Sequence, residues 1–163
     1  NPEQGSWFFL SVVLCSLALE PDEPIFDQCG ACTLCLEACP TQALVAPGQL
    51  DARRCLSYLT IETKGPLPAE WHASLGAHVY GCDICQEVCP FNLAAPVSDD
   101  PAWQPRAAYD AVRLVDLARR DDNAWREALR RSAMKRTGIA RLRRNVEISL
   151  RHVTGDAGAD PDV

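Results

Sequence analysis

Cysteine offers the clearest chemistry in this chain, since nine cysteines occur among 163 residues. The first group is Cys29-Gly-Ala-Cys32-Thr-Leu-Cys35-Leu-Glu-Ala-Cys39-Pro40. Thiolates separated by two residues can surround one corner of a metal–sulfur cube, and the small residues Gly30 and Ala31 permit the tight turns that this requires. The complete run, with its Cys-Pro ending, has the spacing of bacterial ferredoxins that hold two [4Fe-4S] clusters.

The second group is Cys82-Asp-Ile-Cys85-Gln-Glu-Val-Cys89-Pro90, which lacks a leading cysteine at the expected position. Cys55, displaced upstream, can supply the missing thiolate. In two-cluster ferredoxins the cysteine before the proline binds the neighbouring cluster. The sequence therefore predicts one cluster on Cys29, Cys32, Cys35 and Cys89, and a second on Cys39, Cys55, Cys82 and Cys85. Two such clusters must lie close together, which suits electron transfer between them.

Two other uses of cysteine explain the pattern less well. Structural zinc sites combine two C-x2-C pairs, which leaves the third cysteine and the Cys-Pro ending without a role. Disulfides suit secreted chains, but the sequence opens Asn1-Pro2-Glu3 and has no basic residue before Arg53, unlike a signal peptide. We therefore expect clusters, in a fragment of a longer protein. Cys15 lies outside both groups, and we expect it to be a small buried apolar side chain.

The charge changes sign along the chain, although the formal net charge is -6. Residues 1–105 carry thirteen acidic and three basic side chains, whereas residues 106–152 carry six acidic and thirteen basic ones. A solvated helix face is the ordinary explanation of such a run, but Glu147 is the only acid between positions 128 and 152. The basic part therefore predicts contact with the phosphates of a nucleic acid.

The N-terminal part of the chain contains an apolar stretch, Trp7 to Leu19, of thirteen residues. A membrane-spanning helix needs about 20 residues, so we expect no membrane contact. Aromatic and β-branched side chains predict one or two buried strands over residues 6–19, followed by a proline-bounded loop. Residues 28–97 are rich in cysteine, glycine and proline, which predicts a small domain ordered more by metal than by a large core.

Beyond the linker-like residues 98–105, the pattern becomes helical. Apolar side chains recur at three- or four-residue steps in three stripes, which contain Tyr109, Val112 and Val115, then Trp125 and Leu129, then Ile139, Leu142, Val146, Leu150 and Val153. Asn123 can cap a helix, Thr137-Gly138 is a break, and Gly155 is a stop. We expect three short helices over residues 98–155, of the kind that begins a helical repeat array, and a disordered tail over 156–163.

Several runs of residues resemble the epoxyqueuosine reductase family. They are Gly5-Ser-Trp-Phe-Phe-Leu10, Leu50-Asp-Ala-Arg-Arg-Cys55-Leu-Ser-Tyr-Leu-Thr-Ile-Glu62, Lys64-Gly-Pro-Leu-Pro68, Gly81-Cys82-Asp83 through Cys89-Pro90-Phe-Asn92, and Ser132-Ala-Met-Lys-Arg-Thr-Gly138 with Leu142-Arg-Arg-Asn145. The resemblance extends to about residue 155, and the insertion that carries Cys55 is its most specific part. It implies an α+β fold in which a two-cluster ferredoxin-like domain precedes a short α-helical, HEAT-like segment.

The resemblance also implies a function: reduction of epoxyqueuosine to queuosine in tRNA, with cobalamin and two [4Fe-4S] clusters as cofactors. Residues 1–27 would be the edge of a missing catalytic domain that binds cobalamin, so no catalytic residue is assigned here and the fragment alone should be inactive. Ser57 and Tyr58 are expected at the cobalamin edge, or else as core around a cluster. Lys135, Arg136 and Arg144 are expected to contact tRNA phosphates.

This interpretation implies an external electron donor, a monomer, and a place in the cytoplasm. Three alternatives remain open at this stage. A reductive dehalogenase also couples cobalamin to two clusters but gives no reason for the basic helices. A plain ferredoxin leaves the helical part unexplained, and an RNA-binding module could carry clusters that are only structural.

Overall fold

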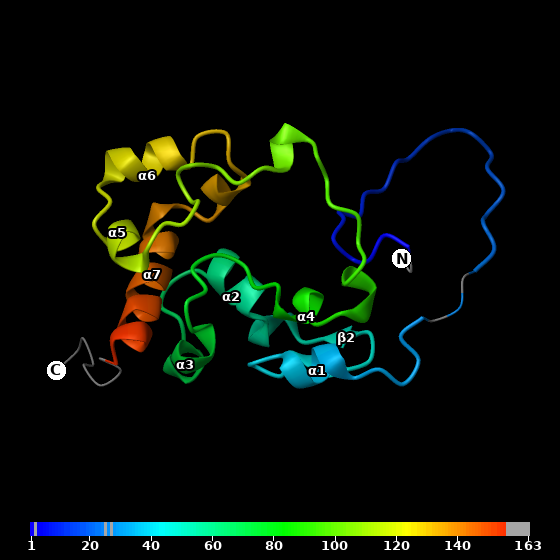
Figure 1. Ribbon diagram of the computed structural model, residues 1–163, viewed down its shortest axis with the longest axis horizontal. Helices are drawn as coiled ribbons and strands as arrows, with labels where there is room; N and C mark the ends of the chain where they lie inside the picture. The colour runs from blue at the N-terminus through cyan, green and yellow to red at the C-terminus, as the bar shows by residue number, and fades with distance from the viewer. Residues whose placement is uncertain (2, 25, 27, 156–163) are drawn as a thin grey trace.

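Short helices make up most of the regular structure in the computed structural model, which describes residues 1, 3–24, 26 and 28–155 (Figure 1). The first elements, with η for a 3-10 helix, are α1 (Leu34–Ala38), β1 (Leu44–Ala46), β2 (Gln49–Leu50), η1 (Ala52–Arg54), α2 (Leu56–Ile61), η2 (Ala69–Trp71), α3 (His72–Leu75), α4 (Ile84–Glu87) and η3 (Pro90–Asn92). The later ones are η4 (Pro101–Trp103), α5 (Leu114–Ala118), α6 (Asp122–Ala128), η5 (Ala133–Arg136) and α7 (Ile139–Thr154). This arrangement confirms the predicted α+β class.

A small hairpin connects the first cysteine group to Cys55. Strands β1 and β2 pair antiparallel, with Leu44 opposite Leu50 and an irregularity before Ala46 pairs with Gln49. The backbone N–H of Asp51 then donates to the carbonyl of Ala43 at 2.8 Å, which closes the hairpin at its base. The hairpin therefore returns the chain toward α1 before α2 begins.

The C-terminal part is helical, as predicted, and its breaks lie close to the expected positions. Helix α6 is capped by Asp121, whose Oδ1 accepts from the N–H of Ala124 at 2.8 Å, so Asp121 takes the role that was predicted for Asn123. Helix α7 follows Gly138 and ends at Gly155, whose φ of +78° is the left-handed conformation that glycine adopts easily. The predicted tail, residues 156–163, lies outside the described residues. Within the described residues, no helix has the length and apolarity needed to cross a membrane.

Helix α7 packs against α2 and α3 on one side and against α5 and α6 on another, so it contributes to two apolar cores (Figure 1). The first core contains Leu56, Leu59, Leu67, Leu75 and Ile148. The second contains Leu117, Trp125, Leu129, Leu142 and Val146. Since Ile148 belongs to one core while Leu142 and Val146 belong to the other, α7 joins the helical segment to the cysteine-rich part.

A buried polar group lies between these cores. Asn145 of α7 is fully buried, and its Nδ2 donates to the carbonyls of Thr60 and Val79, both at 2.8 Å. Its Oδ1 accepts from the Arg144 guanidinium at 2.8 and 3.1 Å. The Thr60 hydroxyl in turn accepts from the N–H of Gly81 at 3.0 Å. This network attaches α7 to α2 and to the segment that leads to Cys82.

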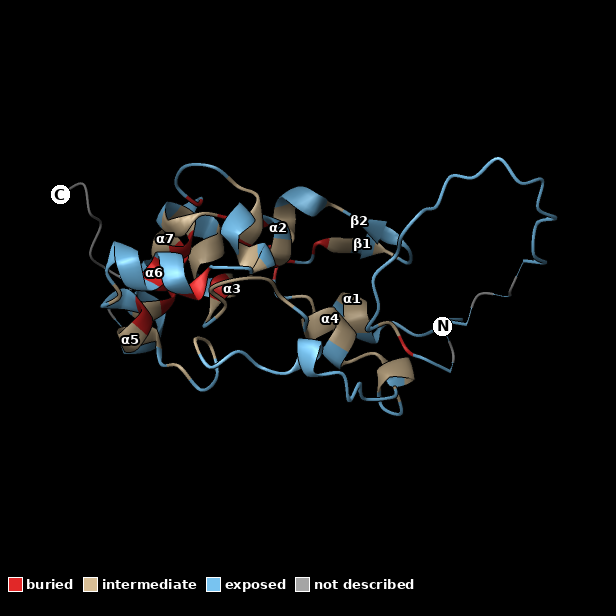
Figure 2. Cartoon of the chain, turned by 90° about the horizontal axis from the view of Figure 1, so that it is seen from above, coloured by how far each residue is buried: buried red, intermediate tan, exposed pale blue. Residues whose placement is uncertain are grey.

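The structure contradicts the prediction of buried strands over residues 6–19. The segment from Trp7 to Leu19 is exposed throughout and contains no strand, and it forms part of a long loop that extends from the body of the chain (Figure 2). Cys15 is exposed as well, so its prediction as a buried side chain was wrong. The physical reason is that no element in the described part of the chain covers this loop, apart from Trp103, whose ring stacks on Phe9 with 5.9 Å between centroids.

The beginning of the chain is nevertheless attached to the second cysteine group. The N–H of Ser6 donates to Oδ1 of Asn92 at 2.7 Å, and Nδ2 of Asn92 donates to the Ser6 hydroxyl at 2.8 Å. Gly5 is buried there with a φ of +71°, and a Cβ at this position would lie 2.3 Å from Oδ1 of Asn92. Glycine is therefore required at position 5 for this attachment.

Replacing Asn145 with Ala should lower the free energy of unfolding by roughly 2 to 4 kcal/mol, because two buried carbonyls and the Arg144 guanidinium lose their partner. Glu147→Ala, on the exposed face of the same helix, is the matched control and should change it by less than about 0.5 kcal/mol. Denaturant unfolding of the metal-loaded chain gives both values. Equal effects of the two substitutions would show that Asn145 does not hold α7 in place.

Candidate functional site

The two cysteine groups adopt the same local structure at an offset of fifty positions, since Cys32, Cys35 and Cys39 correspond to Cys82, Cys85 and Cys89. In each group a short helix, α1 or α4, follows a residue with nearly the same backbone angles: φ -121° and ψ 4° at Thr33, φ -117° and ψ 11° at Asp83. Helix α1 packs against α4. The sequence repeat is therefore also a structural repeat, with its two helices in contact.

The last cysteine of each group leaves its helix in an extended conformation. Cys39 has φ -68° and ψ 112°, and Cys89 has φ -71° and ψ 121°. This conformation, together with the proline that follows, ends the helix and turns the chain away from it. Such a turn is what allows the last thiol of one group to serve a different metal centre from the first three.

The position that would precede Cys82 in the repeat is Val79, so the second group lacks a first cysteine of its own. Cys55 comes from the N-terminal boundary of α2 with φ -69° and ψ 124°. The hydrogen bond from Gly81 to Thr60 attaches the Cys82 loop to the C-terminal half of α2. This contact brings the loop that carries Cys82 next to the helix that begins at Cys55.

Two of the thiols predicted for the second cluster have a raised pKa. Burial raises the pKa of the Cys82 thiol, and Cys55, Asp83 and Cys39 raise it further. Burial also raises the pKa of the Cys85 thiol, with further contributions from Cys82, Cys55 and Cys35. These interactions link Cys39, Cys55, Cys82 and Cys85, the four residues predicted for the second cluster, and they also include Cys35, which is predicted for the first. Binding of iron to the Cys82 and Cys85 thiols, whose pKa is raised, releases protons, so it is favoured as the pH rises.

Cys39 differs from its neighbours because its sulfur accepts hydrogen bonds. Burial opposes its ionisation, but hydrogen bonds from Thr41, Ala43 and Leu44 outweigh burial and lower the pKa of the Cys39 thiol. The N–H of Ala43 donates to this sulfur at 3.2 Å, and the Thr41 hydroxyl lies 3.6 Å away. Thr41 is buried and was missed by the sequence analysis. Its position directly after Cys39-Pro40 was the one signal that could have identified it.

The residues predicted for the first cluster lie on the loop before α1, on α1 itself and after α4. Cys29 and Cys32 are exposed, and a turn joins them through the hydrogen bond from the N–H of Cys32 to the carbonyl of Cys29, at 2.9 Å. Cys35 and Cys89 are half-buried. Contact between α1 and α4 brings the elements of this set together, although the first two thiols remain open to solvent.

The spacing of eight thiols in two groups fits two iron–sulfur clusters. All nine cysteines lie within the described residues, and none is joined in a disulfide. Four thiolates on one Zn²⁺ lie roughly 3.8 Å apart, since the Zn–S bond is about 2.3 Å. Among the described residues, no three Cys, His, Asp or Glu side chains gather closely enough for one ion.

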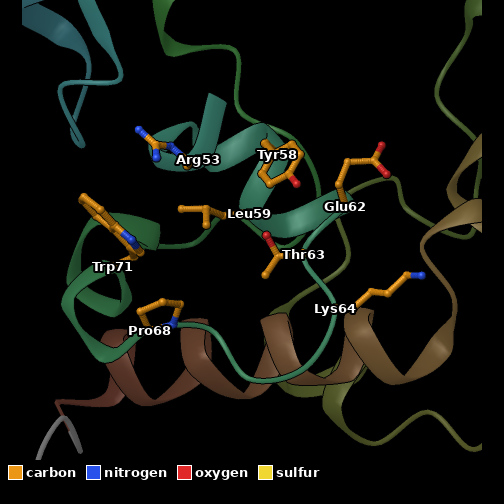
Figure 3. A pocket seen from close by; sticks show the side chains of 8 residues that line it. All are labelled: Arg53, Tyr58, Leu59, Glu62, Thr63, Lys64, Pro68 and Trp71. Atoms are coloured by element: carbon orange, nitrogen blue, oxygen red, sulfur yellow. The ribbon is translucent and has the colours of Figure 1, made fainter. Parts of the chain in front are cut away.

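An open pocket of about 500 Å³ lies on the exposed side of α2 (Figure 3). Its lining residues are Arg53, Tyr58, Leu59, Glu62, Thr63, Lys64, Pro68 and Trp71. Tyr58 is 43% exposed, and Ser57 beside it is half-buried. Tyr58 is therefore a pocket residue and not part of a closed core, and the first core is formed instead by its neighbours Leu56 and Leu59.

The three cations predicted to contact phosphate lie in different environments. Lys135 is exposed, and Arg136 forms an ion pair with Glu62 at the end of α2. Arg144 is half-buried and donates to the carbonyls of Leu59, Thr63 and Gly65 as well as to Asn145. Burial, with repulsion from Arg141, lowers the pKa of Arg144. We therefore assign Arg144 a structural role in place of the predicted phosphate contact.

Comparison with known proteins finds a matching domain family and similar whole proteins. A family described as a 4Fe-4S double cluster binding domain matches residues 28–92, which confirms the prediction of a two-cluster domain. The epoxyqueuosine reductase of Yersinia pestis is 42% identical over 150 residues, which are 92% of this chain and 36% of the relative. That of Escherichia coli (strain K12) is 38% identical over 156 residues, which are 96% of this chain and 41% of the relative.

Solved structures give the same result. A crystal structure of epoxyqueuosine reductase with a tRNA-Tyr epoxyqueuosine-modified tRNA stem loop is 42% identical, with a TM-score of 0.75, over 82% of this chain and 35% of that chain. The enzyme from Bacillus subtilis is 41% identical, with a TM-score of 0.77, over 85% and 37% of the respective chains. This chain thus spans about two fifths of the length of the relatives that it matches.

Cys55→Ala should remove the cluster held by Cys39, Cys82 and Cys85 and leave the other, so that the iron content falls by about half. Cys15→Ala should leave the iron content unchanged, because Cys15 lies on the exposed loop. Iron and sulfide analysis of the anaerobically reconstituted variants measures both. Equal losses from the two substitutions would show that the ligand assignment is wrong.

Proposed function

We propose, from the premise that this chain belongs to the epoxyqueuosine reductase family, that it forms the iron–sulfur electron-transfer part of an enzyme that reduces epoxyqueuosine to queuosine in tRNA. One observation carries the proposal: both cysteine groups and the Cys55 insertion occur within a segment that is about 40% identical to these reductases and has their fold. A plain electron carrier would not require the basic helices that are joined to the clusters through α7.

The chain's own residues would hold two clusters side by side. Cys29, Cys32, Cys35 and Cys89 bind the first, and Cys39, Cys55, Cys82 and Cys85 bind the second. Cys35 is close enough to Cys85 to raise its pKa, so neighbouring ligands of the two clusters interact. The clusters, when bound, would supply one-electron carriers; Cys29 and Cys32, ligands of the first, are exposed, and Cys55, a ligand of the second, lies directly before α2.

The pocket lies beside α2, the helix that follows Cys55, a proposed ligand of the second cluster. Cobalamin, when bound, supplies the metal centre at which the epoxide is reduced, and most of its site belongs to parts of the relatives that this chain does not span. Ser57 and Tyr58 fit its edge, because they lie two and three residues after the cluster ligand Cys55 and Tyr58 lines the open pocket (Figure 3). Their role is to position the cofactor near the second cluster. A tRNA substrate would place the protein in the cytoplasm, where we propose that it acts as a monomer.

The anaerobically reconstituted chain should contain about eight irons and eight sulfides, and its visible absorption should decrease on reduction with dithionite, as expected for two redox-active cubanes. Metal and sulfide analysis together with the absorption spectrum checks this. A colourless protein with stoichiometric zinc would overturn the cluster assignment. A coloured protein whose spectrum dithionite does not change would favour clusters with a structural role.

The activity is tested by exchanging segments. When this chain replaces the corresponding segment of the Escherichia coli relative, the chimera should convert epoxyqueuosine to queuosine in tRNA. Cys55→Ala in the chimera should abolish conversion, whereas Cys15→Ala should preserve it. Mass spectrometry of the tRNA nucleosides measures the product. A chimera that folds, holds both clusters and leaves epoxyqueuosine unchanged would refute the proposed function.

A further inference from the structure

The Thr41 hydroxyl is buried beside a predicted ligand of the second cluster. Thr41 is 3% exposed, and its Oγ1 lies 3.6 Å from the sulfur of Cys39. In the part of the chain that the structure describes, this sulfur is the only hydrogen-bond partner of the hydroxyl. A buried hydroxyl without a partner is costly, so the contact with Cys39 is what satisfies this side chain.

A second donor reaches the same sulfur from the backbone. The N–H of Ala43, a residue that is 1% exposed, donates to Sγ of Cys39 at 3.2 Å. Gln42 lies between the two donors with a φ of +50°, and this left-handed residue turns the chain back toward Cys39. The N–H of Gln42 donates to the carbonyl of Cys39 at 3.0 Å, which closes the turn. Both donors therefore come from one tight turn.

Contacts with two other segments hold this turn in place. The carbonyl of Ala43 accepts from the N–H of Asp51 at 2.8 Å, at the base of the hairpin. The carbonyl of Pro40 accepts from the hydroxyl of Ser74 in α3 at 3.3 Å. Groups that are fixed around a metal ligand orient that ligand and tune the metal centre that it binds. The turn therefore presents its two donors to Cys39 in a fixed orientation.

The repeat of this turn in the second cysteine group does not provide these two donors. Phe91, which has no hydroxyl, stands where the first group has Thr41. Leu93 stands where the first group has Ala43, but it is 85% exposed and its N–H caps η3. The last cysteine of the second group, Cys89, therefore has different surroundings from its counterpart in the first group.

We infer that Thr41 raises the reduction potential of the second cluster by donating a hydrogen bond to the sulfur of Cys39; this inference rests on the proposed function. A thiolate bound to iron has no proton to donate, so the hydroxyl is the donor. On reduction a bound cluster takes up one electron from the reductant, and no proton moves. A donor aimed at a ligand sulfur stabilises the added negative charge and favours the reduced state. Thr41 acts through Cys39 and is not itself a ligand.

The difference between the two groups affects where an electron is held. When two neighbouring centres share one electron, the centre with the higher potential holds it for more of the time. Donors at Cys39 without equivalents at Cys89 bias the electron toward the second cluster. The proposed ligand Cys55 of that cluster lies directly before α2, the helix beside the open pocket.

The test uses the reconstituted full chain, titrated anaerobically with dithionite while electron paramagnetic resonance follows the reduced clusters. Thr41→Val keeps the shape of the side chain and removes the hydroxyl, so the reduction equilibrium of one cluster should fall roughly 2- to 10-fold. The midpoint potential then falls by roughly 20 to 60 mV, because a tenfold change for one electron is about 59 mV. Thr41→Ser retains the hydroxyl and should stay close to the parent. Thr41→Ala is a second variant that removes the hydroxyl without placing a methyl group against the sulfur.

Thr137→Val is the matched control, because Thr137 is also buried but lies between η5 and α7, outside the cysteine groups. Both of its midpoint potentials should equal those of the parent. A further control adds Thr41→Val to Cys55→Ala, which should hold only the first cluster. The remaining midpoint should then be the same with and without the Thr41 substitution.

Three results would overturn the inference. Parent potentials in Thr41→Val and Thr41→Ala, with both clusters present, would show that the hydroxyl does not act on the cluster, and the proposed function would stand. Equal shifts in Thr41→Ser and Thr41→Val would indicate a packing effect, and a shift in the Cys55→Ala background would place Thr41 at the other cluster. A parent chain without a redox-active cluster would refute the inference and the proposed function together.

Discussion

The contact between Asn145 and the backbone of α2 supports the rest of the structure. The cysteine-rich part has helices of only four to six residues, which have little stability of their own. Asn145 satisfies the carbonyls of Thr60 and Val79 within a buried environment, where an unpaired carbonyl would be costly. Since Thr60 also receives the N–H of Gly81, the same group of atoms holds the loop to Cys82 against the helix that starts at Cys55.

Polar and apolar contacts make different contributions to the position of α7. The two cores supply most of the stabilising burial around α7, but apolar contacts do not specify direction. The amide of Asn145 and the planar guanidinium of Arg144 have fixed hydrogen-bond geometry, and together they fix the register of α7 against α2. The segment with the basic residues is thereby held in a defined position relative to the cysteine groups. An electron-transfer domain and an RNA-binding segment would need such a fixed relation in order to act on one substrate.

The sequence predicted those features that depend on local chemistry. The cysteine spacing fixed both groups, and the matched backbone angles at Thr33 and Asp83 follow from that repeat. Glycine at positions 138 and 155 gave the limits of α7 because its left-handed conformation is local. The N-cap of α6 was predicted at Asn123, two residues after Asp121, where the structure has it. Both residue types are good caps, and only the fold selects between them.

Features that depend on distant partners could not be predicted from the sequence. Arg144 looked like a surface cation, but its carbonyl partners lie about eighty positions earlier in the chain. The apolar pattern of residues 6–19 indicated burial, yet burial requires a partner surface, and the described residues provide only Trp103. The ligand assignment of the cysteines follows from spacing and stays a prediction.

The exposed loop has a consequence for the behaviour of this chain in solution. From Trp7 to Leu19 it carries neither charge nor proline, and the side chains of Phe9, Leu10 and Leu14 are each more than 85% exposed. A segment of this composition, with unpaired backbone groups, is a template for intermolecular strand pairing and aggregation. We therefore expect this loop to promote association of the chain at high protein concentration. Charged residues placed within it would act as gatekeepers against aggregation without disturbing the cysteine groups.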